Sequence, residues 1–486
     1  PTSARPGSFS SPGGEMHGRT VASATLFGDD VRVENGSVAV RREQSLRSEA
    51  MDALARHAVF EKGQARDRAR WMIWQIARAV GVHPASIHDL YMARGRGEVG
   101  GFTVPAINVR GMAYDTARAI FRAAVRLDAG AFIVEIARSE IAYTEQRPAE
   151  YVSVMLAAAL REGFRGPVFL QGDHFQVNAK KHAADPTGEV AAVKQLAHEA
   201  ISAGFYNIDV DTSTLVDPRQ GSLDEQQRAN YETAADIIGY VREIQPSQTS
   251  VSVGAEIGEV GGHNSTVAEL RAFMEGFERA RDARGITGCG ISKISVQTGT
   301  SHGGVVLPDG SVGEAPLDLE VLALLSRVAR ETYGLAGAVQ HGASTLPETG
   351  FGVFPAIDTA EIHLATGFQN ILFDNIPEGL RRRMYAWLDA NATAERREGN
   401  TPEQFYYKAR KRALGPFKRE LWELPQEAKD RLASAYDRTF GSLMQQLRVA
   451  GTAGMVSRYV RPIVKGRTPE DGPAVPQAPD DPDAGE

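Results

Sequence analysis

A regular alternation of short apolar runs and amphipathic stretches constrains the fold of this chain more than any other feature. Apolar runs of this length indicate buried parallel strands, and the stretches between them carry apolar residues at helical spacing. Strands are expected over residues 102–109, 131–137, 167–173, 206–211, 250–258, 293–300, 336–342 and 361–366. Helices are expected over residues 112–127, 151–162, 189–203, 224–244, 266–283 and 317–332. Eight such units predict a closed (β/α)8 barrel rather than an open doubly wound sheet.

Three of the expected strands lead into histidine. The third strand ends in Asp173 and His174, the sixth leads to His302, and the seventh leads to His341. The carboxyl ends of barrel strands meet at one face, where the active sites of such barrels lie. Three imidazoles there can bind one divalent cation and leave a position open for substrate oxygens. A single histidine after a strand is more often a capping or core residue, and that alternative stands beside the metal site.

Carboxylates at other strand ends extend this candidate site. Asp211 and Glu256 follow the fourth and fifth strands. They are candidates for a second metal position or for contacts that orient the metal ligands, and the alternative is that they are strand caps and surface acids. Adjacent side chains on a strand point apart, so Asp173 is expected not to share a metal with His174. Asp173 is instead predicted to be a free acid/base that faces the site.

Small residues follow two of the histidines. Gly303 comes directly after His302, and Gly342 and Ser344 come after His341. Glycine lets a ligand approach the backbone closely, and N–H groups exposed there can hold phosphate oxygens, with the serine hydroxyl as a further donor. Ordinary turn chemistry is the alternative.

Lys293 raises the question of Schiff-base chemistry, because it lies on the expected sixth strand. It begins that strand, however, at the end opposite His302. A structural or solvated lysine is therefore expected rather than a nucleophile.

Composition excludes several other classes of protein. The 486 residues carry a net charge of −7 with acidic and basic residues interspersed, so no nucleic-acid partner is expected. No run is long and apolar enough to predict a membrane partner. The single Cys289 excludes an intrachain disulfide and indicates a reducing compartment, so a cytoplasmic location is expected.

The pattern divides the chain into five expected segments. The leader is predicted to be disordered or extended, and its residues 20–42 to form either a small β-hairpin or an arm. Helices with apolar faces are expected before and after the barrel, and the second set is predicted to pack on the barrel or on a partner subunit. The last residues are rich in proline and acids and predict a solvated, disordered tail. The segments are residues 1–44 (leader), 45–95 (helical), 96–376 (barrel), 377–465 (helical) and 466–486 (tail).

Taken in order, the strand ends resemble those of the class II, metal-dependent fructose- and tagatose-bisphosphate aldolases. The resemblance covers residues 88–375 and includes motifs such as Gln171-Gly172-Asp173-His174. Its pieces are residues 104–109, 169–174, 204–213, 254–262, 298–303, 341–344 and 361–366. One such piece is weak evidence, but the full set in the right order on the right strands is strong. The resemblance implies the barrel that the periodicity predicts.

The resemblance also implies a role for each matching residue. Asp173 would be the acid/base that handles the hydroxyl at the bond being cleaved. The implied metal ligands are His174, His302 and His341, with Asp211 and Glu256 at the alternative or second metal position. The implied substrate-binding residues are Asn108, Gly303, Gly342, Ser344, His363, Ala365 and Thr366. Zn²⁺ is the implied cofactor, and a second divalent or a monovalent cation is a further expectation.

The sequence departs from the family mainly in the half of the site that holds substrate. Ala137 stands where the family has a phosphate-binding Ser, and Arg138 is expected either to replace that contact or to be a surface charge. The glycines after the fifth strand are followed by His263 instead of a proton-abstracting Glu, so His263 or Glu259 is a candidate for that role. The family's Asn on strand eight appears as His363. Gln171 replaces a His that often lies two residues before the Asp.

These observations predict zinc-dependent, reversible aldol cleavage of a phosphorylated ketose, a reaction of carbohydrate metabolism such as glycolysis. The metal would stabilise the enediolate as a Lewis acid. A metal-dependent hydrolase or isomerase on the same barrel is the first alternative, and a non-catalytic metal-binding homologue is the second. The expected partners are a small sugar phosphate and other copies of the chain, in a homodimer or homotetramer.

Overall fold

The computed structural model describes residues 26–34, 36–258, 263–299, 305–307, 312–313, 317–343, 346, 349–463, 465–467 and 475–483. Within them, eight parallel strands close into a barrel in the order β4-β5-β6-β7-β8-β9-β12-β13, because β13 pairs with β4. The strands are β4 (Val104–Asn108), β5 (Ile133–Ala137), β6 (Gly166–Gln176), β7 (Asn207–Asp211), β8 (Ser252–Glu256), β9 (Lys293–Val296), β12 (Ala338–Gln340) and β13 (Glu361–Leu364). This confirms the (β/α)8 barrel that the sequence predicts.

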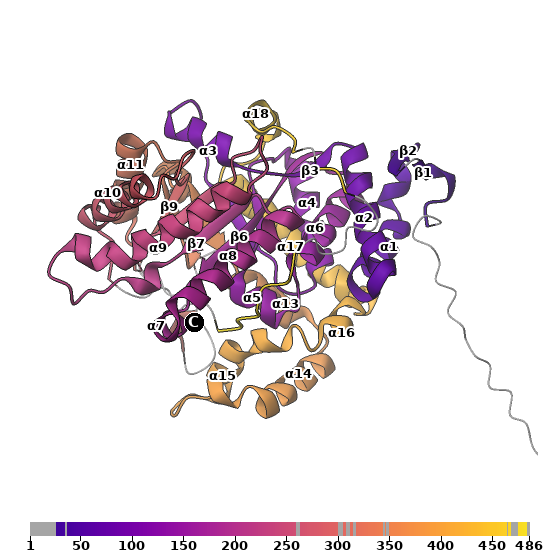
Figure 1. The fold of residues 1–486 in the computed structure, drawn as a ribbon. Helices are drawn as coiled ribbons and strands as arrows, with labels where there is room; N and C mark the ends of the chain where they lie inside the picture. The colour runs from indigo at the N-terminus through magenta and orange to yellow at the C-terminus, as the bar shows by residue number, and fades with distance from the viewer. Residues whose placement is uncertain are drawn as a thin grey trace, which may run out of the picture.

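Helices surround the barrel and cover the outer faces of its strands, as Figure 1 shows. They are α4 (Ala113–Leu127), α6 (Pro148–Glu162), α8 (Pro186–Ala203), α9 (Leu223–Ile244), α10 (Val267–Ala283), α11 (Leu319–Tyr333) and α13 (Thr366–Asn375). Short helices α5 (Arg138–Tyr143), α7 (Ala179–Ala184) and α12 (Val353–Ala356) lie in the connections. Every residue of the barrel strands except Gly166 at the start of β6 is buried, since helices cover one face of the strands and the barrel interior the other.

The N-terminal part packs against the outer helix α6 and adds a strand beside the start of β6. β1 (Val31–Glu34) and β2 (Ser37–Val40) pair as an antiparallel hairpin, one of the two alternatives for this region. Helices α1 (Glu49–Phe60) and α2 (Gly63–Ala79) pack against each other and against α6. The strand β3 (Val82–Ala85) extends the sheet at the start of β6, and the helix α3 (His88–Gly95) follows it.

The C-terminal helices lie at both ends of the barrel. They are α14 (Glu378–Asn391), α15 (Pro402–Ala409), α16 (Lys418–Trp422), α17 (Gln426–Gln446) and α18 (Ala453–Tyr459). In Figure 1, α14 and α15 lie beyond one end of the barrel, and α18 lies beside α3 at the other. α17 packs along α4 and α13. Among the described helices, none has both the length and the apolar character needed to cross a membrane.

Residues 475–483 differ from the expected solvated tail. The Asp481 carboxylate is buried and lies 3.3 Å from a guanidinium nitrogen of Arg138 and 2.9 Å from Lys181 Nζ. Asp483 forms an ion pair with Arg412 at 2.9 Å. Acidic residues favour a solvated segment only where no basic partners face them. Here basic side chains from the barrel and from the C-terminal helices supply those partners.

Candidate active site

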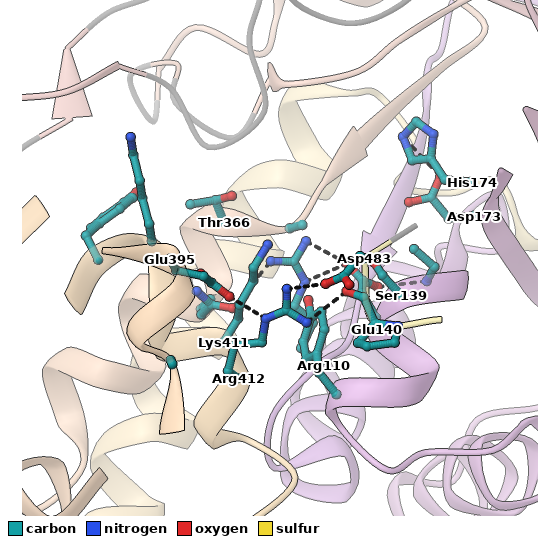
Figure 2. A pocket seen from close by; sticks show the side chains of 18 of the residues that line it. Arg110, Ser139, Glu140, Asp173, His174, Thr366, Glu395, Lys411, Arg412 and Asp483 are labelled. Atoms are coloured by element: carbon teal, nitrogen blue, oxygen red, sulfur yellow. Dashed lines mark hydrogen bonds and ion pairs between the residues drawn. The ribbon is translucent and has the colours of Figure 1, made fainter. Parts of the chain in front are cut away.

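A cavity of about 860 Å³ opens at the carboxyl ends of the barrel strands. Its volume is within the range of roughly 300–1,000 Å³ that is usual for small-molecule sites. The barrel contributes a group that we call the strand-end floor: Glu135, Asp173, His174, His341 and His363. Loops and helices at this end of the barrel, the C-terminal helices and residues 482–483 supply the rest of its lining, part of which Figure 2 shows.

A bulge in β6 directs Asp173 and His174 into the same cavity. The register between β6 and β7 shifts between Gly172 and Phe175, and His174 has a φ of 39°. A bulge with a residue in the left-handed region re-aims side chains that would otherwise alternate between faces. The expectation that the two adjacent side chains diverge here is therefore wrong, whereas the role of Asp173 as a free acid/base that does not bind the metal stays a prediction.

Three side chains of the floor come close enough to hold one cation. Asp173, His174 and His341 each offer a ligand atom, and these atoms lie within 4.8 Å of one another. The rings of His174 and His341 have centroids 4.4 Å apart. Asp173 Oδ1 is buried and lies 3.2 Å from His363 Nδ1. Two imidazoles and a carboxylate suit a divalent transition metal such as zinc. The third predicted ligand, His302, lies outside the described residues.

Asp211 and Glu256 lie behind His174 rather than on the cavity surface. His174 Nδ1 is 3.3 Å from Asp211 Oδ2 and 3.7 Å from Glu256 Oε2. Asp211 is held in turn by the backbone N–H and hydroxyl of Ser213. Carboxylates in this position orient a ligating imidazole and increase its basicity. The same three side chains also form a group compact enough to hold a cation, so both predicted alternatives remain open for this pair.

Polar side chains also fill the barrel interior below the floor. Lys293 Nζ donates to Asp209 Oδ2 at 2.9 Å, to Glu361 Oε1 at 2.5 Å and to Gln171 Oε1 at 2.9 Å. Tyr91 donates to the other oxygen of Glu361. Lys293 is buried and its ammonium is surrounded by acceptors, which is the structural role expected for it. The alternative of a solvated lysine is wrong, because the barrel interior excludes water from this end of β9.

His363 connects this interior network to the floor. Its Nδ1 lies 3.2 Å from Glu135 Oε2 and 3.2 Å from Asp173 Oδ1, and its Nε2 lies 2.7 Å from Glu361 Oε1. The His363 ring centroid is 4.1 Å from that of His341. His363 thus lines the cavity, as predicted from the resemblance, but carboxylates enclose it on both nitrogen sides.

The charges of the floor shift the pKa values of its members. Burial alone would lower the pKa of the His174 imidazole, but Asp173 and two further carboxylates raise it well above its usual value. Burial would raise the pKa of Asp173, yet His174 and His363 hold it well below its usual value. Burial and the charge of Asp173 raise the pKa of Glu135 to about 7. An environment that stabilises positive charge on His174 stabilises a divalent cation by the same attraction.

The remaining predicted substrate residues fall into three groups. Gly342, Ala365 and Thr366 line the cavity. Asn108 is buried, and its amide donates to Glu140 Oε2 at 2.7 Å instead of facing the cavity. Gly303 and Ser344 lie outside the described residues.

Several lining residues were not predicted from the sequence. Arg110 faces the cavity in an ion pair with Glu140 at 2.6 Å, and Lys411 and Arg412 reach it from the C-terminal helices. Glu135 on the floor and Glu361 beneath it occupy otherwise apolar strands. A charged residue within an apolar strand is the signal that would have found these two, because charge there must face either a partner or a ligand.

The sequence pattern of the class II fructose-bisphosphate aldolases matches residues 95–427, more than half of the chain. The chain belongs to the class II fructose-bisphosphate aldolase family. No curated protein matches it in sequence.

Solved structures with this fold share little sequence with the chain. Fructose-bisphosphate aldolase from Campylobacter jejuni is 18% identical with a TM-score of 0.45, over 76% of this chain and 97% of that one. A probable tagatose 6 phosphate kinase from Sinorhizobium meliloti 1021 is 16% identical with a TM-score of 0.50, over 74% and 99%. Fructuronate-tagaturonate epimerase from Cohnella laeviribosi is 11% identical with a TM-score of 0.52, over 87% and 90%. At these identities the likeness shows the fold alone.

Arg138 and His263, two residues at which the chain departs from its aldolase family, have ion-pair partners outside the cavity lining. Arg138 neither faces the cavity nor lies at the surface, because it is buried between Glu189, at 2.5 Å, and Asp481. Both predicted alternatives for it are wrong. His263 is largely exposed and pairs with Glu269 at 2.7 Å. Glu259, the other candidate for the missing base, lies outside the described residues.

Proposed function

We propose that this aldolase-family protein catalyses zinc-dependent, reversible aldol cleavage of a phosphorylated ketose. The observation that carries the proposal is the convergence of Asp173, His174 and His341 within 4.8 Å at the floor of the cavity. Aldol cleavage needs a cation that stabilises a developing oxyanion and a nearby group that moves a proton. The floor offers a candidate for each requirement.

In this proposal, some residues of the chain bind the metal and another transfers a proton. His174 and His341 hold the zinc ion, with the predicted ligand His302 as the third. When bound, the ion supplies Lewis-acid chemistry that polarises the ketose carbonyl. Asp173 takes the proton from the hydroxyl of the carbon whose bond breaks, and this carbon becomes an aldehyde. The electron pair of the broken bond passes to the donor carbon, to which the sequence candidate Glu259 returns a proton. Because His174 and His363 hold the pKa of Asp173 well below its usual value, its carboxylate is ionised at neutral pH.

Solvent-deuterium exchange into dihydroxyacetone phosphate tests the proposal. The exchange reports proton removal from the donor half of the reaction and does not require the correct aldehyde. We expect exchange with the zinc-loaded protein and none with His174→Ala. The matched control is His198→Ala, because His198 lies on the outer helix α8 and its ring contacts Tyr240.

Absence of exchange in fully zinc-loaded wild-type protein would contradict the proposed reaction, because no proton would then be removed from dihydroxyacetone phosphate. Equal loss in His198→Ala would mean that the assay reports folding and not the site. Metal binding without turnover of any sugar phosphate would favour the non-catalytic homologue.

A second candidate is epimerisation of a ketose acid, an isomerase reaction. The observation that favours it is the floor, where a candidate cation site lies beside carboxylates, and the fructuronate-tagaturonate epimerase shares its fold with 87% of this chain. Breaking and re-forming a carbon–carbon bond on the same floor would invert one hydroxyl-bearing carbon. NMR of fructuronate incubated with the protein separates the two reactions: a single new six-carbon product indicates epimerisation, and three-carbon products indicate cleavage.

A further inference from the structure

Residues 475–483 cross the outside of the barrel in an extended form. The segment contains Pro476, Pro479 and Pro482. Proline has no N–H to donate to a helix or a sheet and holds its φ near one value, so these residues keep the segment extended and reduce the freedom that it loses on binding. In Figure 1 the yellow trace of the segment passes beside α8 and α5.

Helix α8 binds the first half of the segment through polar contacts. Gln195 Nε2 donates to the carbonyl oxygen of Gln477 at 2.9 Å, and the N–H of Ala478 donates to Glu199 Oε2 at 2.9 Å. Among residues 475–483, Ala478 is the one apolar residue that is buried. Few buried apolar contacts and many exposed polar ones are typical of a part of a structure that opens locally.

Asp481 is the buried anchor of the segment. Its carboxylate lies between the guanidinium of Arg138 on α5 and the ammonium of Lys181 on α7. The side chains of Asp480 and Asp483 are 64% and 70% exposed, so water screens their ion pairs. Binding of the segment to the barrel therefore depends mainly on Asp481.

The end of the segment forms part of the cavity wall. Pro482 and Asp483 both line the cavity. Arg412, in the 3-10 turn that follows α15, donates to the carbonyl oxygen of Pro482 and to Asp483 Oδ1, each at 2.9 Å. Figure 2 shows Asp483 with Arg412 at the cavity. The segment thus connects α5, through Arg138, to the C-terminal helices on the other part of the lining.

We propose that residues 475–483 form a strap that closes one side of the cavity while Asp481 is bound by Arg138 and Lys181, and that opens this side when those ion pairs break. In the closed state, Pro482 and Asp483 complete the wall between α5 and the turn after α15. In the open state, that side of the cavity is accessible to ligands. The strap controls access to the cavity whatever reaction takes place there.

The labelling rate of a thiol placed on the cavity wall tests the strap. Ser139 is buried, lines the cavity and follows Arg138 directly in the chain. Ser139→Cys, combined with Cys289→Ser to remove the single native thiol, is the reporter protein. Mass spectrometry of the intact chain measures its reaction with iodoacetamide over time.

We expect Asp481→Asn in the reporter protein to increase the labelling rate about tenfold or more, because the strap is then open for a larger share of the time. Lys181→Met should increase the rate in the same direction, and it leaves the sequence of the strap intact. The matched control is Asp480→Asn, which removes an exposed partner of Arg147. We expect this control to keep the labelling rate of the reporter protein within about twofold.

Thermal unfolding of each variant separates opening of the strap from loss of the fold. Faster labelling of Asp481→Asn in a protein that still unfolds cooperatively supports the strap. Equal labelling rates in the reporter protein and in Asp481→Asn would overturn it. An equal acceleration by Asp480→Asn would also overturn it, because the buried ion pairs would then not control the opening.

Discussion

Lys293 illustrates how a single charge can hold a barrel interior together. Its ammonium lies among Asp209, Glu361 and Gln171, all of them buried. Asp209 and Glu361 raise the pKa of Lys293 against the opposing effect of burial, and Lys293 lowers the pKa of Glu361. The charged forms of Lys293 and Glu361 are therefore favoured, and the removal of Lys293 leaves buried carboxylates without their cation.

At this scale we predict that Lys293→Met lowers the free energy of unfolding by about 3–5 kcal/mol, because two buried carboxylates lose their cation. Urea denaturation measures the change. Lys194→Met is the control: its ion pair with Asp236 is partly exposed, and such pairs contribute about 0–1 kcal/mol. A loss below 1 kcal/mol for Lys293→Met would contradict the structural role assigned to this lysine.

The bulge in β6 is the element that creates the candidate metal site. Gly172 permits it, because a Cβ at this position would lie 2.4 Å from the ring of Phe175. Phe175 is buried, so its ring has little room to retreat. The positions of Asp173 and His174 therefore depend on the absence of one methyl group next to them.

We predict that Gly172→Ala lowers the free energy of unfolding by about 1–3 kcal/mol, since overpacking forces side chains and backbone to shift. It should also weaken zinc binding by about tenfold or more, because the shift reaches Asp173 and His174. Zinc titration with a competing chelator measures the second effect. Gly379→Ala on α14 is the control, because a Cβ there has open space around it. We expect it to lower neither the free energy of unfolding nor the zinc affinity. Wild-type zinc affinity in Gly172→Ala would show that the bulge is not needed.

The segment of residues 475–483 is a second element with its own energetics. It is anchored by Asp481, which is 1% exposed, and by the more exposed Asp480 and Asp483. The buried carboxylate satisfies Arg138 inside the protein. It is therefore expected to contribute more than the exposed pairs, which water screens.

We predict that Asp481→Asn increases amide hydrogen exchange of residues 475–483 by about tenfold or more, because charged hydrogen bonds contribute about 1.5–3 kcal/mol. Hydrogen–deuterium exchange with mass spectrometry resolves the segment. Asp480→Asn, which removes an exposed partner of Arg147, should change the exchange far less. Equal effects of the two substitutions would mean that burial of Asp481 adds nothing.

At the scale of the whole molecule, His88 makes the free energy of unfolding depend on pH. It begins α3, is 4% exposed, and burial followed by the charge of Arg242 lowers its pKa to about 4 from 6.5. Between these two values the unfolded chain binds a proton that the folded chain excludes. The contribution of His88 is therefore fully present above pH 6.5 and is lost as the pH falls toward 4.

We predict that this loss amounts to about 3 kcal/mol at pH 4 relative to pH 7. Urea denaturation at several pH values measures it. His88→Asn removes the titrating group, so its unfolding free energy should fall less steeply between pH 6.5 and 4 than that of the wild type. The values at pH 8 give the baseline difference between the two proteins. Parallel curves would show that His88 does not titrate across this window.

The C-terminal helices change what the barrel can bind. α15, the turn after it and the segment before it supply basic side chains to a cavity to which the barrel contributes carboxylates and imidazoles. The family pattern extends to residue 427 and so includes these helices. A homodimer or homotetramer remains a prediction.

The sequence by itself determined the order of strands and helices and the positions of the strand-end histidines. Each expected strand contains or overlaps an observed one, because burial between helices and barrel interior imposes a local apolar period that can be read along the chain. The resemblance placed Asp173, His174 and His341 at one end of the barrel. This follows because the carboxyl ends of all parallel strands of a barrel lie at the same face.

Only the tertiary structure decided which of these side chains meet. The bulge that turns Asp173 and His174 the same way depends on pairing between β6 and β7 and on the space around Gly172. The partners of Lys293 come from strands up to 122 residues away, and Asp481 is ordered by Arg138 more than 300 residues before it. Such contacts are set by packing between distant segments, for which a local sequence period carries no signal.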